Sequence, residues 1–144
     1  MQIPVINQSR HPLPEYQTAH AAGLDVRANL AEAVTLKPLQ RALIPTGLFL
    51  EIPVGYEMQV RPRSGLAYKY GIGIVNSPGT IDADYRGELK VLLVNLSDTN
   101  FVVQDGERIA QLVVARYETI NWQPTQTLSE TTRGTGGYGS TGNS

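Results

Sequence analysis

Cysteine is absent from this chain of 144 residues, and histidine occurs only twice. Without cysteine there is no disulfide framework, no thiol nucleophile and no zinc site built on thiolates, and two scattered histidines do not suffice for a histidine-rich metal site. Any metal ion that the protein binds must therefore prefer oxygen ligands.

Charged side chains are also scarce. They make up 17% of the residues, and 12 basic against 13 acidic side chains leave a net charge of −1. Proteins that coat nucleic acid carry a clear excess of basic residues. We therefore expect no nucleic-acid partner, and any bound anion must be held by a local cluster.

Long apolar runs are missing too. No stretch reaches the ~18 apolar residues of a membrane-spanning helix, and residues 1–10 lack the positively charged and then apolar stretches of a secretory signal. We expect no membrane partner and a cytoplasmic location.

The sequence does contain many short apolar segments separated by glycine and proline, in a length that fits one domain. We expect an ordered domain over residues 1–130 and a flexible glycine-rich tail over residues 131–144. Many short strands predict an all-β sandwich or barrel. The segments predicted to be strands are Arg41–Ile52, Tyr56–Arg63, Leu89–Leu96, Phe101–Gln104 and Arg108–Tyr117.

Two of these segments differ in pattern. Residues 56–61 alternate apolar and polar side chains, as a half-buried strand does, whereas Val91 to Val94 is continuously apolar, which predicts a strand covered on both faces. One short helix is also predicted, with Ser64 as its N-cap and Gly71 as its end.

The tail contains closely spaced glycines from Gly134 onward. They match the dinucleotide-binding glycine pattern by letter but neither follow a strand nor open a helix, so we reject that interpretation. Phosphate oxygens can be bound there by successive backbone N–H groups, by the guanidinium of Arg133 and by the hydroxyls of Ser140 and Thr141. A functionless terminus is the alternative, and Tyr138 argues against it because disordered tails contain few aromatic residues.

Three further clusters carry candidate chemistry. Arg63 and Ser64 stand where a strand ends and the short helix begins, which suits an anion, although a simple cap and a solvated arginine are alternatives. Asp82 and Asp84 lie in a turn-rich stretch that could equally be a polar hairpin loop. Asp25, in an apolar segment flanked by glycine, could be only a turn residue.

Together and in this order, the clusters resemble the five motifs of the trimeric deoxyuridine triphosphate nucleotidohydrolases, the dUTPases. The resemblance covers nearly the whole chain. The five matching segments are residues 22–28, 62–71, 79–88 with Asn76 ahead of them, 106–113 and 133–142.

The resemblance implies a distorted jelly-roll-like all-β subunit with one short helix, a homotrimer with active sites shared between subunits, and hydrolysis of dUTP to dUMP and pyrophosphate with Mg²⁺. It makes Asp82 the general base that deprotonates water for in-line attack on the α-phosphorus. It places Tyr85 against the deoxyribose, where the ring leaves no room for a 2′-hydroxyl. Asp25 is expected to reach Mg²⁺ through water.

The resemblance also implies the remaining substrate contacts. Asn76 and nearby backbone groups read the uracil, Arg63, Ser64 and Gln111 hold phosphates, and the tail closes over the nucleotide with Tyr138 stacked on the base. The complete set of expected substrate-binding residues is Arg63, Ser64, Gly65, Asn76, Gly79, Thr80, Ile81, Tyr85, Gln111, Arg133, Tyr138, Gly139, Ser140 and Thr141.

One departure and two alternatives accompany this resemblance. Tyr138 stands where the family usually has Phe, and both rings stack. A dCTP deaminase-like enzyme of the same fold is one alternative, but that family usually has a glutamate where this chain has Leu92. A catalytically inactive nucleotide-sensing module is the other, and the presence of Asp82, Tyr85 and Arg133 speaks against it.

Overall fold

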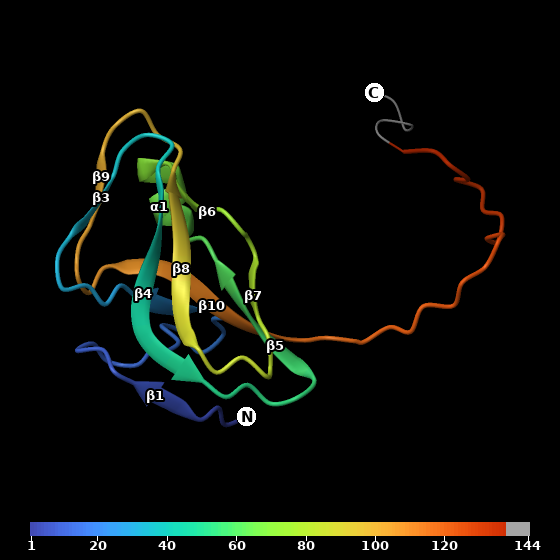
Figure 1. Cartoon of the computed structure of the whole chain (residues 1–144), viewed down its shortest axis with the longest axis horizontal. Coiled ribbons are helices and arrows are strands. Elements are labelled where there is room, and N and C mark those ends of the chain that lie inside the picture. Colours follow the sequence, from blue (N-terminus) through green and yellow to red (C-terminus); the bar gives the residue numbers. More distant parts are fainter. Residues whose placement is uncertain (138–144) are drawn as a thin grey trace.

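The structure, a computed structural model, describes residues 1–137 and contains ten strands and one short helix in that part of the chain. The all-β fold with a single short helix is therefore confirmed (Figure 1). The elements are β1 (Val5–Asn7), β2 (Leu24–Arg27), β3 (Val34–Leu36), β4 (Arg41–Leu50), β5 (Tyr56–Arg61), α1 (Ser64–Tyr70), β6 (Ile72–Ile74), β7 (Gly79–Ile81), β8 (Glu88–Asn95), β9 (Phe101–Val103) and β10 (Arg108–Arg116).

The strands form two four-stranded sheets and a two-stranded ribbon, with antiparallel pairing throughout. One sheet has the order β1-β4-β8-β6, the other has the order β2-β10-β5-β7, and β3 pairs with β9. Because neighbours in each sheet are distant in sequence, side chains from separate parts of the chain meet on one surface. This arrangement positions the candidate site.

The five segments predicted as strands are β4, β5, β8, β9 and β10, each within two residues of its expected bounds. The remaining strands are only three or four residues long, too short for a periodic pattern to develop. β1, β2, β6 and β7 pair with the long strands β4, β10, β8 and β5 and satisfy backbone N–H and C=O groups there, whereas β3 pairs with the equally short β9.

The core lies between the sheets, and β8 shows how the sequence builds it. Leu89, Val91 and Leu93 are buried and alternate with less buried residues. The prediction of a strand covered on both faces is wrong for the single chain, because Leu92 is only half-buried and pairs with the exposed Leu43 of β4. The outward face of β4 and β8 therefore leaves the apolar pair Leu43 and Leu92 open.

The helix begins one residue earlier than expected. Arg63 is the N-cap, with an extended backbone and no capping side-chain hydrogen bond, so the prediction of Ser64 as N-cap is wrong. A chain that leaves β5 extended enters the helix directly, and Ser64 becomes its first residue. Gly71 ends it in the left-handed conformation, with φ of 65°, as predicted.

A buried amide, that of Asn95, lies at the end of β8 in the sheet β1-β4-β8-β6. The Nδ2 of Asn95 donates to the carbonyls of Leu36 and Thr99 at 2.8 and 2.7 Å, and its Oδ1 accepts from the backbone N–H and the hydroxyl of Ser97. Asn95 is fully buried, so each of these bonds satisfies a group that water cannot reach. One side chain thus joins the end of β8 to the end of β3.

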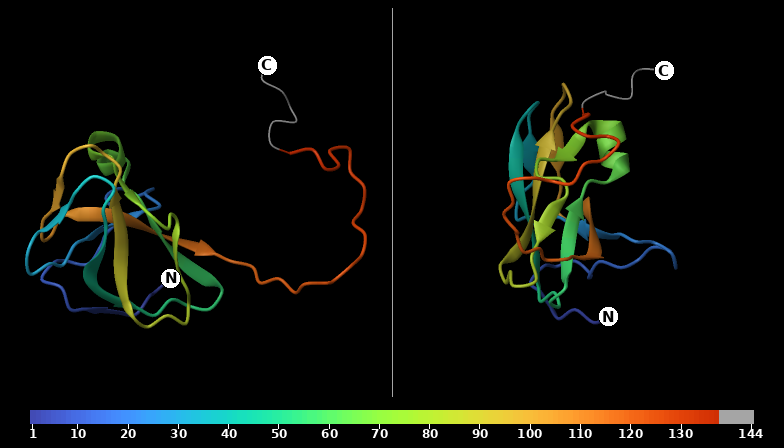
Figure 2. Two further views of the ribbon diagram at one scale, coloured as in Figure 1. Left: turned by 45° about the horizontal axis from the view of Figure 1, so that its top comes forward. Right: turned by 90° about the vertical axis from the view of Figure 1, so that its right-hand side faces the viewer.

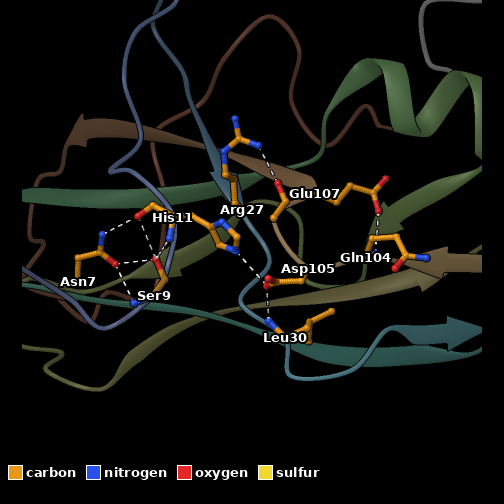
Figure 3. Close-up of polar contacts among 9 residues, drawn as sticks. Asn7, Ser9, His11, Arg27, Leu30, Gln104, Asp105 and Glu107 are labelled. Carbon is orange, nitrogen blue, oxygen red and sulfur yellow. Dashed lines mark hydrogen bonds and ion pairs between the residues drawn. The ribbon is translucent and has the colours of Figure 1, made fainter.

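Beyond the pairing of β1 with β4, the N-terminal segment contacts the domain through His11 (Figure 3). The His11 Nε2 lies 2.9 Å from Asp105 Oδ1, which also accepts from the backbone N–H of Leu30 at 2.8 Å. The hydrogen bond with His11, followed by that from Leu30, lowers the pKa of the Asp105 carboxyl. Gly106 leaves space for the imidazole ring of His11, because a Cβ at this position would lie 2.9 Å from His11 Cε1.

After β10 the chain leaves the domain, as the orange and red segments of Figures 1 and 2 show. Residues 118–137 contain no strand or helix, and the side chains of Ile120, Trp122 and Leu128 are 67%, 87% and 88% exposed. Among residues 1–137, no helix has the length and apolar character needed to cross a membrane.

Asp105→Asn should lower Tm at pH 7, because the variant loses the charged acceptor that His11 and Leu30 share. A carboxyl with a lowered folded-state pKa stabilises the protein above its unfolded pKa, and this contribution disappears as pH falls through the folded-state pKa. The difference in Tm between wild type and variant should therefore be largest at pH 7 and become smaller below pH ~4. Calorimetry at pH 7 and pH 3 measures it.

Asp98→Asn is the matched control, since Asp98 is an exposed acid with no polar side-chain contact in the described residues. A Tm gap for Asp105→Asn that stays constant with pH would contradict the role of its carboxylate.

Candidate functional site

Asp25 is held between two arginines. Its Oδ1 accepts from Arg63 Nε and its Oδ2 accepts from Arg108 NH1, each at 3.1 Å, and Arg63 NH1 also donates to the Arg108 carbonyl at 2.9 Å. The carboxylate is 22% exposed, so these charge-assisted bonds are partly shielded from water. Two guanidinium groups against one carboxylate leave an excess of one positive charge on this surface.

Strand pairing explains why these residues meet. Gln111 of β10 lies opposite Asp25 on one side and Arg61 of β5 on the other. The Gln111 side chain donates from Nε2 to the Pro62 carbonyl at 2.9 Å, and Gly23 leaves space for it because a Cβ there would collide with its amide. Three predicted residues, Asp25, Arg63 and Gln111, therefore lie together.

Ser64 and Gly65 continue this surface at the first turn of α1. Both are exposed, and a Cβ at Gly65 would meet nothing within 4 Å. Free backbone N–H groups at the start of a helix suit an anion. They lie next in the chain to Arg63, as the sequence predicts.

Asp82 and Tyr85 belong to a second cluster, built on the turn after β7. The backbone N–H of Tyr85 donates to the Asp82 carbonyl at 3.2 Å, and Arg86 NH1 donates to the carbonyls of Ala83 and Tyr85 at 2.7 and 3.0 Å. Asp82 is exposed, and its side chain has no hydrogen-bond partner among the described residues. A carboxylate in this state is free to accept a proton from water.

Tyr85 and Asp82 line one hollow of about 240 Å³ together with Thr80 and Ile81. The Tyr85 hydroxyl donates to the Glu88 carbonyl at 3.1 Å. The carboxylate of Glu88 accepts from the Gly47 N–H at 2.9 Å, at an irregularity in β4 where Gly47 has φ of 70°. Asp82 also lines a larger neighbouring hollow of about 740 Å³.

Asn76 lies beside Gly79, where a Cβ would approach its Nδ2 to 3.2 Å. Asn76 is exposed, and Gly79, Thr80 and Ile81 form β7, paired with β5. The residues expected to read a uracil thus come together on one strand and its preceding turn.

The described part of the tail, residues 131–137, is not brought to either cluster (Figure 1). Arg133 donates from Nε to the Gly136 carbonyl at 2.8 Å, and Gly134 has φ of 53° in the same short turn. Tyr138, Gly139, Ser140 and Thr141 lie outside the described residues.

The two clusters remain separate within one chain. Asp25 and Arg108 line a hollow with Arg27, residues 12–15 and Gln17, whereas Asp82 lines the hollows described above. In residues 1–137, no hydrogen bond or ion pair links the Asp25 cluster to Asp82. Within one chain, Arg63 and Arg108 are therefore not assembled into one site with the candidate base Asp82.

A family model described as dUTPase matches residues 9–142. The chain belongs to the dUTPase family. It is 57% identical over 140 residues to deoxyuridine 5′-triphosphate nucleotidohydrolase of Cytophaga hutchinsonii, covering 97% of this chain and 91% of that protein. It is also 57% identical over 136 residues to the enzyme of the same name from Chlamydia muridarum, covering 94% of each chain.

The solved structures agree with this family assignment. Staphylococcus bacteriophage 80alpha dUTPase with dUPNHPP superposes with a TM-score of 0.88 at 29% identity, covering 99% of each chain. The resemblance to dUTPases and the jelly-roll-like fold that it implies are therefore confirmed.

Sequence reasoning gave no role to Arg108, although Arg108 lies within the fourth matching segment. Its guanidinium pairs with Asp25 across 83 positions of sequence. Its only signal in the sequence was its place in that segment, because the contact depends on the pairing of β2 with β10.

Asp25→Asn should weaken binding of the triphosphate. The asparagine amide turns an N–H₂ group toward one guanidinium, so one arginine loses its acceptor and its orientation. Loss of a charged hydrogen bond of ~1.5 kcal/mol corresponds to a rise of about tenfold in Kd. Titration calorimetry with a non-hydrolysable α,β-imido analogue of dUTP measures it.

Asp84→Asn is the control, because Asp84 is exposed and has no polar side-chain contact among residues 1–137. An unchanged Kd for Asp25→Asn would mean that the two arginines do not depend on Asp25.

Proposed function

We propose that this protein hydrolyses dUTP to dUMP and pyrophosphate. Membership of the dUTPase family over residues 9–142 carries this conclusion. The hollow that contains both Asp82 and Tyr85 supports it, because there a carboxylate with no hydrogen-bond partner in residues 1–137 lies beside an aromatic ring suited to a sugar.

In the proposed reaction, Asp82 is the general base. Its carboxylate takes a proton from a water molecule, whose oxygen forms a new bond to the α-phosphorus. The bond from that phosphorus to the oxygen bridging to the β-phosphorus breaks, and pyrophosphate leaves with the bridging oxygen and its electron pair. Positioning and charge neutralisation lower the remaining barrier.

We assign selectivity for the base and the sugar to the cluster built on β7 and the turns that flank it. Asn76 and the backbone of Gly79, Thr80 and Ile81 read the uracil edge in a pocket too narrow for the thymine methyl. Tyr85 lies against the deoxyribose and excludes a 2′-hydroxyl. The hollow that Tyr85 shares with Thr80, Ile81 and Asp82 is small enough for side-chain contact to decide between sugars.

Phosphate binding is assigned to Arg63, Ser64, Gly65 and Gln111, whose surface carries the excess positive charge. Bound Mg²⁺ would neutralise negative charge on the triphosphate. Each Asp25 oxygen accepts one guanidinium hydrogen bond and keeps a further lone pair, which fits contact with the ion through water. Within residues 1–137 no group of three or more His, Cys, Asp or Glu side chains is placed to hold a metal ion, so we infer that Mg²⁺ enters with the nucleotide.

We further propose a homotrimer whose subunits share the active sites, because within one chain Asp82 lies apart from Arg63 and Arg108. The outward face of β4 and β8 supports this proposal. It carries the apolar pair Leu43 and Leu92, and Leu43 also lines the hollow that contains Asp82. A second copy packed on this face buries apolar surface and places its own side chains at that hollow.

The tail is assigned to closure of the site. Arg133, Ser140 and Thr141 hold the γ-phosphate, with Gly139 allowing close approach, while Tyr138 stacks on the base. Ordering of this segment over a bound nucleotide excludes water that is not reacting.

A panel of nucleotides tests the activity. Purified protein with Mg²⁺ should release pyrophosphate from dUTP faster than from dTTP, dCTP or UTP by roughly two orders of magnitude, because each competitor adds or removes a group that the proposed pocket contacts. Comparable rates with all four nucleotides would contradict the proposed specificity.

A single substitution tests the base. Asp82→Asn should lower kcat by about 10²–10⁴-fold, the range for loss of a general base, while the Kd of the imido analogue stays unchanged. Turnover like that of the wild type would exclude Asp82 as the base.

The same variant tests the sharing of sites between subunits. Asp82→Asn and Arg63→Ala should each be inactive alone, yet trimers that contain both should recover part of the activity, because some sites then combine an intact Asp82 with an intact Arg63. Co-refolded mixtures that stay inactive would place both residues in one subunit's site.

A further inference from the structure

The ring of Tyr85 is held by its own turn. Its hydroxyl donates to the Glu88 carbonyl three residues later, and its backbone N–H donates to the Asp82 carbonyl. The ring therefore folds back along residues 85–88 instead of extending into solvent. Tyr85 is 45% exposed, so these local contacts, and not burial in the core, fix its pose.

Gly87 lies directly beneath this ring. A Cβ at Gly87 would lie 2.5 Å from Cζ and 2.9 Å from Cε2 of Tyr85, and closer still to the hydroxyl oxygen. The backbone of Gly87 is outside the left-handed region, unlike that of Gly47 or Gly106. Glycine is therefore needed here for the space taken by the ring and not for the backbone conformation.

An added methyl group at this position displaces the ring and not the main chain. Glu88, the next residue, is paired with Phe49 of β4, and the guanidinium of Arg86 holds the carbonyls of Ala83 and Tyr85. The half-exposed ring can rotate away at the cost of one hydrogen bond, that from its hydroxyl to the Glu88 carbonyl. The chain on either side of Gly87 cannot move without breaking these bonds.

We propose that Gly87 is a specificity-determining positioning residue, which lets Tyr85 lie flat against its own turn and so keeps ribonucleotides out of the hollow. This inference rests on the proposed function of Tyr85. Gly87 acts through the ring, because the ring and not Gly87 lines the hollow with Thr80, Ile81 and Asp82. A ring rotated off Gly87 no longer occupies the place where a 2′-hydroxyl must be excluded.

Steady-state kinetics of Gly87→Ala test the proposal. The ratio of kcat/KM for dUTP to that for UTP should fall by about tenfold, a size typical of a local change in a binding pocket. Gly73→Ala is the matched control, because a Cβ at Gly73 lies at an ordinary 3.6 Å from Val94 Cγ1 and Gly73 is outside the site. The control should keep the wild-type ratio.

A double-mutant cycle separates action through the ring from a general effect. In a Tyr85→Ala background the additional change Gly87→Ala should not alter the dUTP to UTP ratio any further, because the group that it displaces is gone. A further fall in that background would overturn the proposal, as would an unchanged ratio in the single Gly87→Ala variant.

The outcomes distinguish this inference from the proposed function. A wild-type protein that does not discriminate between dUTP and UTP contradicts the role of Tyr85 itself. A wild type that discriminates, together with a Gly87→Ala variant that has the same dUTP to UTP ratio, contradicts only the role of Gly87. If Gly87→Ala does not fold, Tyr85→Phe loses the bond to the Glu88 carbonyl and should lower the same ratio, and an unchanged ratio would then show that the pose of the ring does not matter.

Discussion

The central place of β10 in its sheet is the constraint on which the candidate site depends. Because β10 pairs with β2 on one side and β5 on the other, the side chains of Asp25, Gln111 and Arg61 lie in one row although they come from distant parts of the chain. The start of α1 follows β5 directly and adds Arg63 to the same surface. Without this pairing there would be two separate arginines and an isolated acid.

The charges in this row explain why the protein needs no large excess of basic residues. Arg63 and Arg108 are oriented by Asp25, so their donors are in place before an anion arrives and little ordering is needed when it binds. The Asp25 carboxylate also limits the repulsion between the two guanidinium groups. A chain with a net charge of −1 thus presents a local surface that suits a triphosphate.

The long strands and the end of the helix could be predicted from local patterns, since alternation over residues 56–61 and the glycine at position 71 are features of the chain itself. Most of the three- and four-residue strands could not: Val34–Leu36, for example, is defined by its pairing with Phe101–Val103, a segment distant in the sequence. Contacts such as His11 with Asp105, 94 positions apart, carry no local signal. The roles of Asp82, Tyr85 and the tail came from family resemblance and remain predictions.

Glu88 connects the sheet β1-β4-β8-β6 to the aromatic ring of Tyr85. Its carboxylate is anchored at the irregularity in β4, while its carbonyl receives the hydroxyl of the aromatic ring. A one-residue insertion or deletion near Gly47 therefore shifts the anchor beneath that ring, although the change lies in a strand with no catalytic residue. The pose of the Tyr85 ring and the alignment of β4 with β8 are therefore connected through Glu88, so a change in one affects the other.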